Sequence, residues 1–330
     1  MAFWVGSYRG KGGKGLYALS AADGRVVVTE AEPRIANASF GIFSPRHGVT
    51  YFVEEEAARV AAWRYDEAWH PMTDLPSGGT APCYLALSPD ERWLACANYA
   101  DGVVALFRLD PDNGDLVGLA SCGAPGGAGP DPERQEGPHA HCVVFASDGG
   151  VLYHVDLGSD RVFRHRLEDG HIAASEVAFS APAGFGPRHL LFHPDGVHAL
   201  LICELSAQLL LLAIEADGSF ACLDSVATIP QAGGGDNLGG HLAIDDQGRV
   251  LVTNRGRDSL VRFVIREARL EMLDWRPTGG ASPRHFAQHQ GGALVAHEES
   301  GSLTRVWWDR SEPSSVADIP GAAFVIDIPG

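Results

Sequence analysis

Residues 187–205 read PRHLLFHPDGVHALLICEL. This stretch predicts two short apolar strands joined by a Pro-Asp-Gly turn. Five other segments repeat the same plan, at residues 38–55, 81–99, 138–158, 239–256 and 283–299. Successive turn centres lie 44 to 58 residues apart. A repeat of this length built from short strands is typical of a β-propeller, in which each repeat forms one four-stranded blade.

The remaining strands at the two ends of the chain predict a seventh blade. The mean repeat spacing of about 49 residues divides into the chain of 330 residues nearly seven times. The C-terminal AAFVIDI reads as one strand, and the N-terminal FWVGSY, GLYALSA and RVVVTEA read as three. We therefore expect an all-β, seven-bladed propeller, as a single domain over residues 1–330. Its ring is closed by N- and C-terminal strands that share the last blade.

Charge and composition exclude several classes of partner. The formal net charge is −17, which argues against nucleic acid and anionic membrane as partners. The six cysteines show no CxxC spacing, and the N-terminus MAFWVGSYRG shows no signal-peptide pattern. No apolar run is long enough to span a bilayer. We expect a cytoplasmic protein.

Blade geometry predicts which side chains can meet. The first strand of each blade should line the central channel, and the second should run antiparallel to it. The start of the first strand and the end of the second then lie at the same rim. The candidates at this rim are Cys83, Asn98, His139, His141, Asp156, Arg188, Glu204, Gly240, Asn254, Arg255, Arg284, His297 and Glu298.

Glu204 and Arg188 belong to one blade and are expected on adjacent strands. The apolar run before Glu204 indicates a carboxylate at the end of a buried strand, and such a charge needs a partner. A functional pair and a purely structural ion pair both fit this pattern. Arg284 repeats the Pro-Arg-His context of Arg188, so it could serve the channel or only echo the repeat. Three histidines should point between blades as core residues: His189, His241 and His285.

Two Gly/Pro-rich segments, 123–137 and 230–240, are long for connections in a compact ring. Both lead into first strands, so we expect them to overhang the channel mouth as a lid or as substrate-contacting loops. Neither contains the Gly-Lys-Ser/Thr of a phosphate-binding loop. The rim has carboxylates and histidines, but arginines beside them would oppose a divalent cation. We expect no metal and no cofactor.

The chain resembles the seven-bladed lactonase family of bacterial 6-phosphogluconolactonases and fungal carboxymuconate-lactonizing enzymes. The resemblance runs end to end, and it is carried by GSYRGKGGKGLYAL, PCYLALSPDERWLACANY, PHAH with VDLGSDR, GPRHLLFHPDG with CEL, and TNRGRDSL. It implies a metal-free site at the channel rim, with the functional residues of the family at His139 or His141, Arg188, Glu204 and Arg255. Two features depart from the family. Cys203 stands where an Asn is usual, and two later turns read DDQG and HQGG.

These residues suggest hydrolysis of a sugar-acid lactone. Glu204 would act as general base on water, and His139 or His141 would protonate the leaving alkoxide. Arg188 and Arg255 would hold an anionic group and stabilise the oxyanion. Arg284, Asp156 and Asn98 are further candidates for substrate binding. The same set could perform a lactonizing cycloisomerisation, and a non-catalytic binding propeller is the other alternative. The oligomeric state is open.

Overall fold

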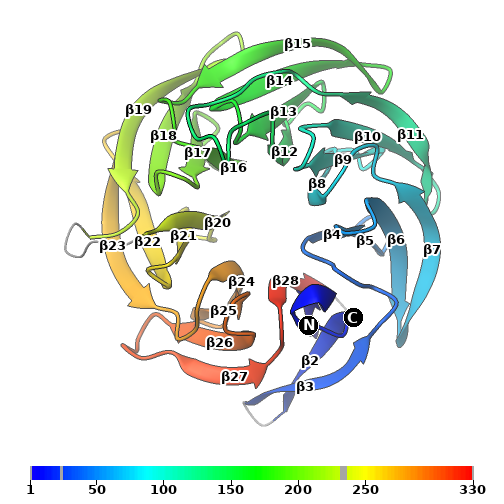
Figure 1. The fold of residues 1–330 in the computed structure, drawn as a ribbon, viewed down its shortest axis with the longest axis vertical. Coiled ribbons are helices and arrows are strands. Elements are labelled where there is room, and N and C mark those ends of the chain that lie inside the picture. Colours follow the sequence, from blue (N-terminus) through cyan, green and yellow to red (C-terminus); the bar gives the residue numbers. More distant parts are fainter. Residues whose placement is uncertain (1, 23–24, 231–235, 329–330) are drawn as a thin grey trace. The chain divides into compact units, whose positions relative to one another are not determined.

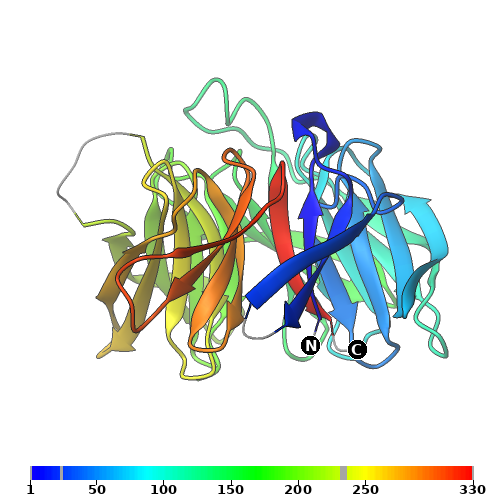
Figure 2. The ribbon, with the colours of Figure 1, turned by 90° about the horizontal axis from the view of Figure 1, so that it is seen from below.

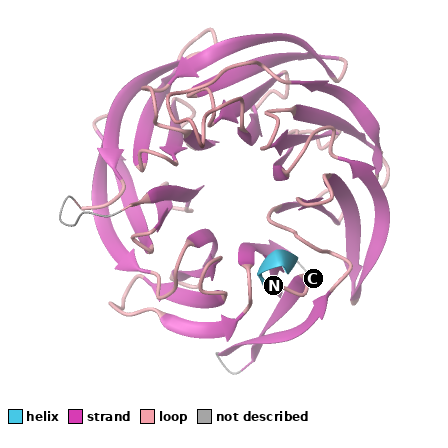
Figure 3. Ribbon diagram, viewed as in Figure 1, coloured by secondary structure: helices cyan, strands magenta, loops and turns pink. Residues whose placement is uncertain are grey.

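The computed structural model describes residues 2–22, 25–230 and 236–328. These residues form seven four-stranded antiparallel sheets, and their one helix is a short 3-10 turn, η1 (Arg9–Lys11) (Figure 3). The prediction of an all-β, seven-bladed propeller is confirmed. The chain divides into two compact units, which are described separately. Unit 1 comprises Met1–Ala38, Leu191–Ala213 and Cys222–Gly330; unit 2 comprises Ser39–Leu190 and Ile214–Ala221. The single-domain assignment stays a prediction.

Three sheets lie wholly within unit 2, and each takes its four strands in chain order. The first contains β4 (Gly41–Ser44), β5 (Val49–Glu54), β6 (Arg59–Asp66) and β7 (Ala68–Pro76). The second contains β8 (Pro82–Leu87), β9 (Trp93–Asn98), β10 (Val104–Leu109) and β11 (Leu116–Gly123). The third contains β12 (Ala140–Phe145), β13 (Val151–Asp156), β14 (Arg161–Glu168) and β15 (His171–Ser180).

Three of the other four sheets also take their strands in chain order. One contains β16 (Pro187–Phe192), β17 (His198–Cys203), β18 (Gln208–Ile214) and β19 (Phe220–Ala227). Two more lie in unit 1: β20 (Leu238–Ile244), β21 (Val250–Arg255), β22 (Ser259–Arg266) and β23 (Arg269–Pro277), then β24 (Pro283–His289), β25 (Gly292–His297), β26 (Ser302–Trp307) and β27 (Ser314–Asp318). The last sheet has the order β28 (Ala322–Ile328), β1 (Ala2–Ser7), β2 (Leu16–Ala22) and β3 (Arg25–Glu32).

The two ends of the chain share this last sheet. Strand β28 pairs antiparallel with β1, from Ala2 opposite Ile328 to Ser7 opposite Ala322. Figures 1 and 2 show β28 in red beside the blue N-terminal strands. Because β28 covers an edge of β1 that would otherwise be free, the C-terminal strand completes this four-stranded sheet. The predicted arrangement of one C-terminal and three N-terminal strands is confirmed.

The hydrophobic core lies between neighbouring sheets. In unit 2, Tyr51 and Val53 of β5 pack with Leu85 of β8 and Leu94 of β9, all nearly inaccessible to solvent. The second strands are buried almost throughout, which explains why they read as continuous apolar runs rather than as alternating patterns. The fourth strands, such as β15, are largely exposed. The inner strands are therefore held firmly on both faces.

The predicted register within a blade is confirmed in both units. The start of the first strand lies opposite the end of the second in four sheets, through the pairs Pro82–Asn98, Ala140–Asp156, Gly239–Asn254 and Pro283–His297. Each pairing is followed by a break in register. This break leaves an extra residue on the first strand, which is the pattern of a β-bulge.

Candidate active site

The bulges explain how candidate side chains come to project from these strands. The extra residue is Cys83 in β8, His141 in β12 and Arg284 in β24. A bulge bends its strand and re-aims the side chain at that position, and bulges are common beside active sites. The repeat pattern had aligned Arg188 with His141, but it gave no sign of this backbone irregularity. The bulges are therefore a structural finding.

In unit 1, Glu204 forms a buried ion pair with Arg255. An Arg255 Nη2 lies 2.7 Å from Oε2 of Glu204, whose side chain is 2% exposed. The backbone supports the pair, because the Gly239 N–H donates to the Glu204 carbonyl and Arg255 Nη2 donates to the Gly239 carbonyl at 3.4 Å. A buried carboxylate tolerates desolvation when a guanidinium donates to it. The two residues expected to cooperate here are therefore in direct contact.

A second charged group in unit 1 surrounds Glu298. Arg284 Nη1 lies 3.2 Å from Glu298 Oε2, and Lys11 Nζ lies 2.8 Å from Glu298 Oε1. Burial acts to raise the pKa of Glu298, but Arg284, Lys11 and Arg255 together hold it below its usual value. The Arg284 guanidinium also lies over the ring of Tyr8, 5.4 Å from its centroid. Lys11 and Tyr8 are members of this group that the sequence analysis did not select.

In unit 2, Arg188 donates a hydrogen bond to His141. The Nη1–Nε2 distance is 2.7 Å, and the two residues are 3% and 5% exposed. Because a guanidinium can only donate, Nε2 of His141 must accept, and the ring carries its proton on Nδ1. In this state His141 is a neutral hydrogen-bond acceptor. The proposed pairing of Arg188 with Glu204 stays a prediction.

His139 makes the opposite kind of contact. Its Nδ1 donates to the Tyr99 carbonyl at 2.8 Å, and its Nε2 lies 3.3 Å from Glu136 Oε1. Both ring nitrogens therefore face acceptors, whereas Nε2 of His141 faces a donor. The ring stacks on Tyr99 with 4.6 Å between centroids, and Tyr99 meets His141 edge-on at 5.5 Å. Of the two predicted histidines, His139 is the one placed to donate a proton.

The loop at 123–137 contacts His139 and Tyr99. Glu136 lies beside His139, and Arg134 Nη2 donates to the Tyr99 hydroxyl at 3.2 Å. Gln135 is fully buried and donates to the Leu157 carbonyl at 2.9 Å, which fixes the loop to the end of β13. Figure 2 shows the loop projecting beyond the strand ends. Its predicted role as a lid or substrate-contacting loop stays a prediction. In the 230–240 segment, residues 231–235 lie outside the described residues.

The side chains of Asn98 and Asp156 form hydrogen bonds with backbone groups. Asn98 is fully buried, and its side-chain amide donates to the carbonyls of Ser77 and Val103. The Asp156 carboxylate accepts hydrogen bonds from the N–H groups of His139 and Ser159. Burial raises the pKa of Asp156, although these hydrogen bonds act in the opposite direction. Both residues occupy the last pair of the second strand. The residue that follows Asn98 is Tyr99. The same position in three other sheets carries Glu204, Arg255 and Glu298. The sequence analysis therefore missed Tyr99 by one residue.

The histidines expected between blades pack among aromatic rings. His189 is 4% exposed, and its ring lies 5.0 Å from Tyr84 and 5.5 Å from His141. His241 and His285 approach each other to 3.8 Å between ring centroids. His189 and His241 are buried, as expected of core histidines, whereas His285 is half-buried. His189 additionally supports the ring of His141.

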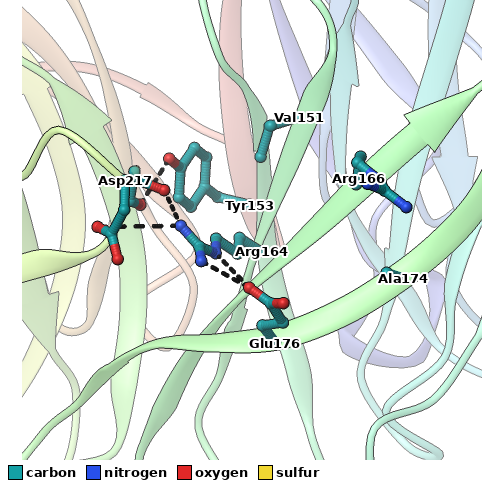
Figure 4. A pocket seen from close by; sticks show the side chains of 8 residues that line it. Val151, Tyr153, Arg164, Arg166, Ala174, Glu176 and Asp217 are labelled. Atoms are coloured by element: carbon teal, nitrogen blue, oxygen red, sulfur yellow. Dashed lines mark hydrogen bonds and ion pairs between the residues drawn. The ribbon is translucent and has the colours of Figure 1, made fainter.

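Two surface pockets of the described residues contain none of the predicted site residues. In unit 2, a pocket of about 330 Å³ is lined by Tyr153, Arg164, Glu176 and Asp217. Figure 4 shows that Arg164 contacts Glu176 and Asp217. Arg166, which also lines this pocket, pairs with Glu168. In unit 1, a pocket of about 660 Å³ lies beside Asp246, His289 and Asp327. Neither pocket has a grouping comparable to the buried pairs above.

The described part of the chain contains no group of three or more His, Cys, Asp or Glu side chains that could hold a metal ion. Within residues 2–22, 25–230 and 236–328, no helix has the length and apolar character needed to cross a bilayer.

The fold is a seven-bladed propeller, and buried polar pairs lie near the ends of its inner strands. Residues 2–313 match the family described as lactonase, 7-bladed beta-propeller, and the chain belongs to this family. It is 29% identical to 6-phosphogluconolactonase of Bacillus subtilis, over 91% of this chain and 89% of that protein.

Solved structures with similar folds carry related names. One is a putative 6-phosphogluconolactonase from Bacteroides fragilis, with a TM-score of 0.85 and 25% identity, covering 98% of this chain and 97% of the other. Another is the periplasmic gluconolactonase of Pseudomonas aeruginosa, with a TM-score of 0.84 and 27% identity over 99% of both chains.

Proposed function

We propose that this protein hydrolyses the lactone of a sugar acid, with 6-phosphogluconolactone as the first substrate to test. The observation that carries the proposal is the buried contact between Glu204 and Arg255 in unit 1. It pairs a potential base with a cation that can bind an anion, in a chain that belongs to a lactonase family. The names of the similar proteins support the substrate class.

Glu204 would be the general base. Its carboxylate accepts a proton from water, and the water oxygen attacks the lactone carbonyl carbon. The negative charge that develops on the carbonyl oxygen is stabilised by an arginine, a contribution of several kcal/mol in comparable sites. Arg255 would move from Glu204 to the substrate for this step. Arg284 and Lys11, which share Glu298, would supply additional positive charge for an anionic substrate.

The unit 2 residues would complete the reaction. As the bond between the carbonyl carbon and the ring oxygen breaks, that oxygen takes a proton from His139, and the product is a hydroxy acid. We assign the proton to His139 because both of its nitrogens face acceptors, whereas His141 accepts from Arg188. Arg188 would bind the oxyanion. Joint action of both groups on one lactone is part of this proposal, and it rests on the sequence-based prediction that these strand ends share one rim.

The test is a substrate panel of phosphorylated and unphosphorylated sugar δ- and γ-lactones together with carboxymuconates. Hydrolysis is followed by acid release and lactonization by absorbance, each with and without prolonged chelator treatment. We expect hydrolysis of a sugar-acid lactone that chelator leaves intact. Turnover of carboxymuconate alone would support a cycloisomerase instead. Activity abolished by chelator and restored by calcium or zinc would overturn the metal-free mechanism, and binding without turnover would indicate a non-catalytic propeller.

A further inference from the structure

The motifs DLGSDR and NRGRDS each contain an aspartate that the proposed reaction does not use, Asp160 and Asp258. Both lie in the turn between the second and third strands of a blade, and both have a positive φ, 56° and 42°. A non-glycine residue is uncommon there and costs some conformational energy, although Asp tolerates it better than most. Something other than the turn itself must therefore favour aspartate.

The same turn forms in other blades without a carboxylate. The equivalent positions are Ala58, Gly102, Ala207 and Gly301, all with positive φ. The backbone carbonyl at this position accepts a hydrogen bond from just beyond the fourth strand, whichever side chain it carries. The acceptors include Ala58, Ala207 and Gly301 as well as Asp160 and Asp258. The turn and its backbone hydrogen bond therefore do not require aspartate.

The two carboxylates instead hold the segment that leads into the next blade. Asp160 is 5% exposed, and its oxygens accept from the N–H groups of Gly184 and Gly186, both at 2.7 Å. Such hydrogen bonds to a charged acceptor are about twice as strong as neutral ones. Gly184 and Gly186 have φ values of 80° and 58°, which turn their N–H groups toward the carboxylate. Gly186, the second of these two donors, is two residues before Arg188.

The second copy has the same spacing. Asp258 accepts from the Ser282 N–H at 2.8 Å, and Ser282 has a φ of 59°. Ser282 is two residues before Arg284, as Gly186 is two residues before Arg188. A blade with Cys83 in place of the arginine has the same bend without a carboxylate. Ala81, two residues before Cys83, has a φ of 55°, and the preceding turn carries Ala58 at the position of the aspartate.

We propose that Asp160 and Asp258 are positioning residues for Arg188 and Arg284. Each carboxylate fixes the backbone two residues before its arginine, so that Arg188 meets His141 and Arg284 meets Glu298. The carboxylates touch no substrate. The catalytic consequence rests on the proposed function of Arg188, whereas the effect on side-chain geometry does not.

The decisive variant is Asp160→Gly, because glycine accepts the positive φ without strain and removes only the carboxylate. Its matched control is Ala58→Gly, the same change in the turn that precedes Cys83. We expect Asp160→Gly to lower kcat/KM for lactone hydrolysis by about 10- to 100-fold, as misplacement of a positioning group does. Ala58→Gly should keep wild-type kcat/KM. In an Arg188→Ala background, Asp160→Gly should cause no further loss.

A second readout does not depend on activity. The ¹⁵N NMR signal of His141 Nε2 reports the hydrogen bond from Arg188, and Asp160→Gly should shift it toward its value in Arg188→Ala. If the wild type hydrolyses no lactone, the proposed function fails and this signal still tests the positioning role. A well-folded Asp160→Gly protein with unchanged kcat/KM and an unchanged His141 signal would overturn the proposal. Asp160→Asn provides the same comparison should the glycine variant not fold.

Discussion

Equivalent backbone positions carry different chemistry in the two units. The position at the end of the second strand holds Glu204, Arg255 and Glu298 in unit 1, where they form buried or half-buried ion pairs. In two sheets of unit 2, it holds the uncharged Tyr99 and Leu157, beside histidines and a buried arginine. The propeller frame thus sets where side chains project. The residue type then decides whether a position supplies a carboxylate base or a support for an imidazole.

The largest effect is expected in unit 1, from Glu204→Gln. Glutamine keeps the size and hydrogen-bonding capacity of glutamate but cannot take up a proton from water. Turnover should fall by about 10²- to 10⁴-fold, the usual contribution of a general base. Steady-state kinetics and melting temperature should be measured on the same preparation.

Glu299→Gln is the matched control. Glu299 follows Glu298 in the sequence, is largely exposed, and forms a salt bridge with Lys11. It should retain nearly full turnover. A well-folded Glu204→Gln protein with wild-type turnover would remove Glu204 from the mechanism. A Glu204→Gln protein with a lowered melting temperature and normal turnover per folded molecule would show that the ion pair with Arg255 is structural.

The next effect sharpens the contrast between the units. Arg188→Lys keeps the charge but loses the planar donor fork that reaches His141. We expect a loss of about 10²-fold in kcat/KM, comparable to removing one oxyanion donor. Arg284→Lys should cost less, because Lys11 also donates to Glu298 and can replace the donor contact that is lost with the guanidinium fork. If Arg284→Lys were the more damaging change, the charged group around Glu298 would matter more for the reaction than the contact of Arg188 with His141.

The sequence predicted the fold because its repeat is redundant. The turns that lost Pro-Asp-Gly, DDQG and HQGG, still connect paired strands, since Asp245 accepts from the Gln247 and Arg249 backbone as a turn residue should. The final strand was predicted with the bounds that the structure shows, Ala322–Ile328. Hydrophobic runs and turn residues act locally, so they can be read from one chain.

The site was less predictable because side-chain direction depends on bulges and on hydrogen bonds between distant residues. A bulge adds one residue to the first strand without changing the local sequence pattern. On the second strand, the choice of Asn98 rather than Tyr99 was a one-residue error. The functional difference between His139 and His141 depends on Glu136, Tyr99 and Arg188, which single-chain reasoning could not bring together. Aligning the Asn98 and Asn254 positions, and then taking the next residue, would have identified Tyr99.

The smallest effect on turnover is expected from His297→Asn, which tests stability rather than catalysis. His297 occupies the position of Asn98 and Asn254, and its Nδ1 donates to the Ser302 carbonyl as Asn98 donates to Val103. Burial lowers the pKa of His297 to about 4, although the Ser302 hydrogen bond and Asp258 partly oppose this. Asparagine can keep the donor and does not titrate, so turnover at neutral pH should be unchanged.

The pH dependence follows from the direction of that shift. The unfolded histidine binds a proton below about pH 6.5, whereas the folded one stays neutral until about pH 4. Protonation therefore favours unfolding as the pH falls through this window, and the stability contributed by the neutral buried ring is lost. His154 and His165, whose pKa values burial also lowers, should produce part of the same loss in both proteins. In urea unfolding, His297→Asn should reduce the loss between pH 7 and pH 4 by about 2–3 kcal/mol. An identical loss in both proteins would show that the ring of His297 is not buried in its neutral form.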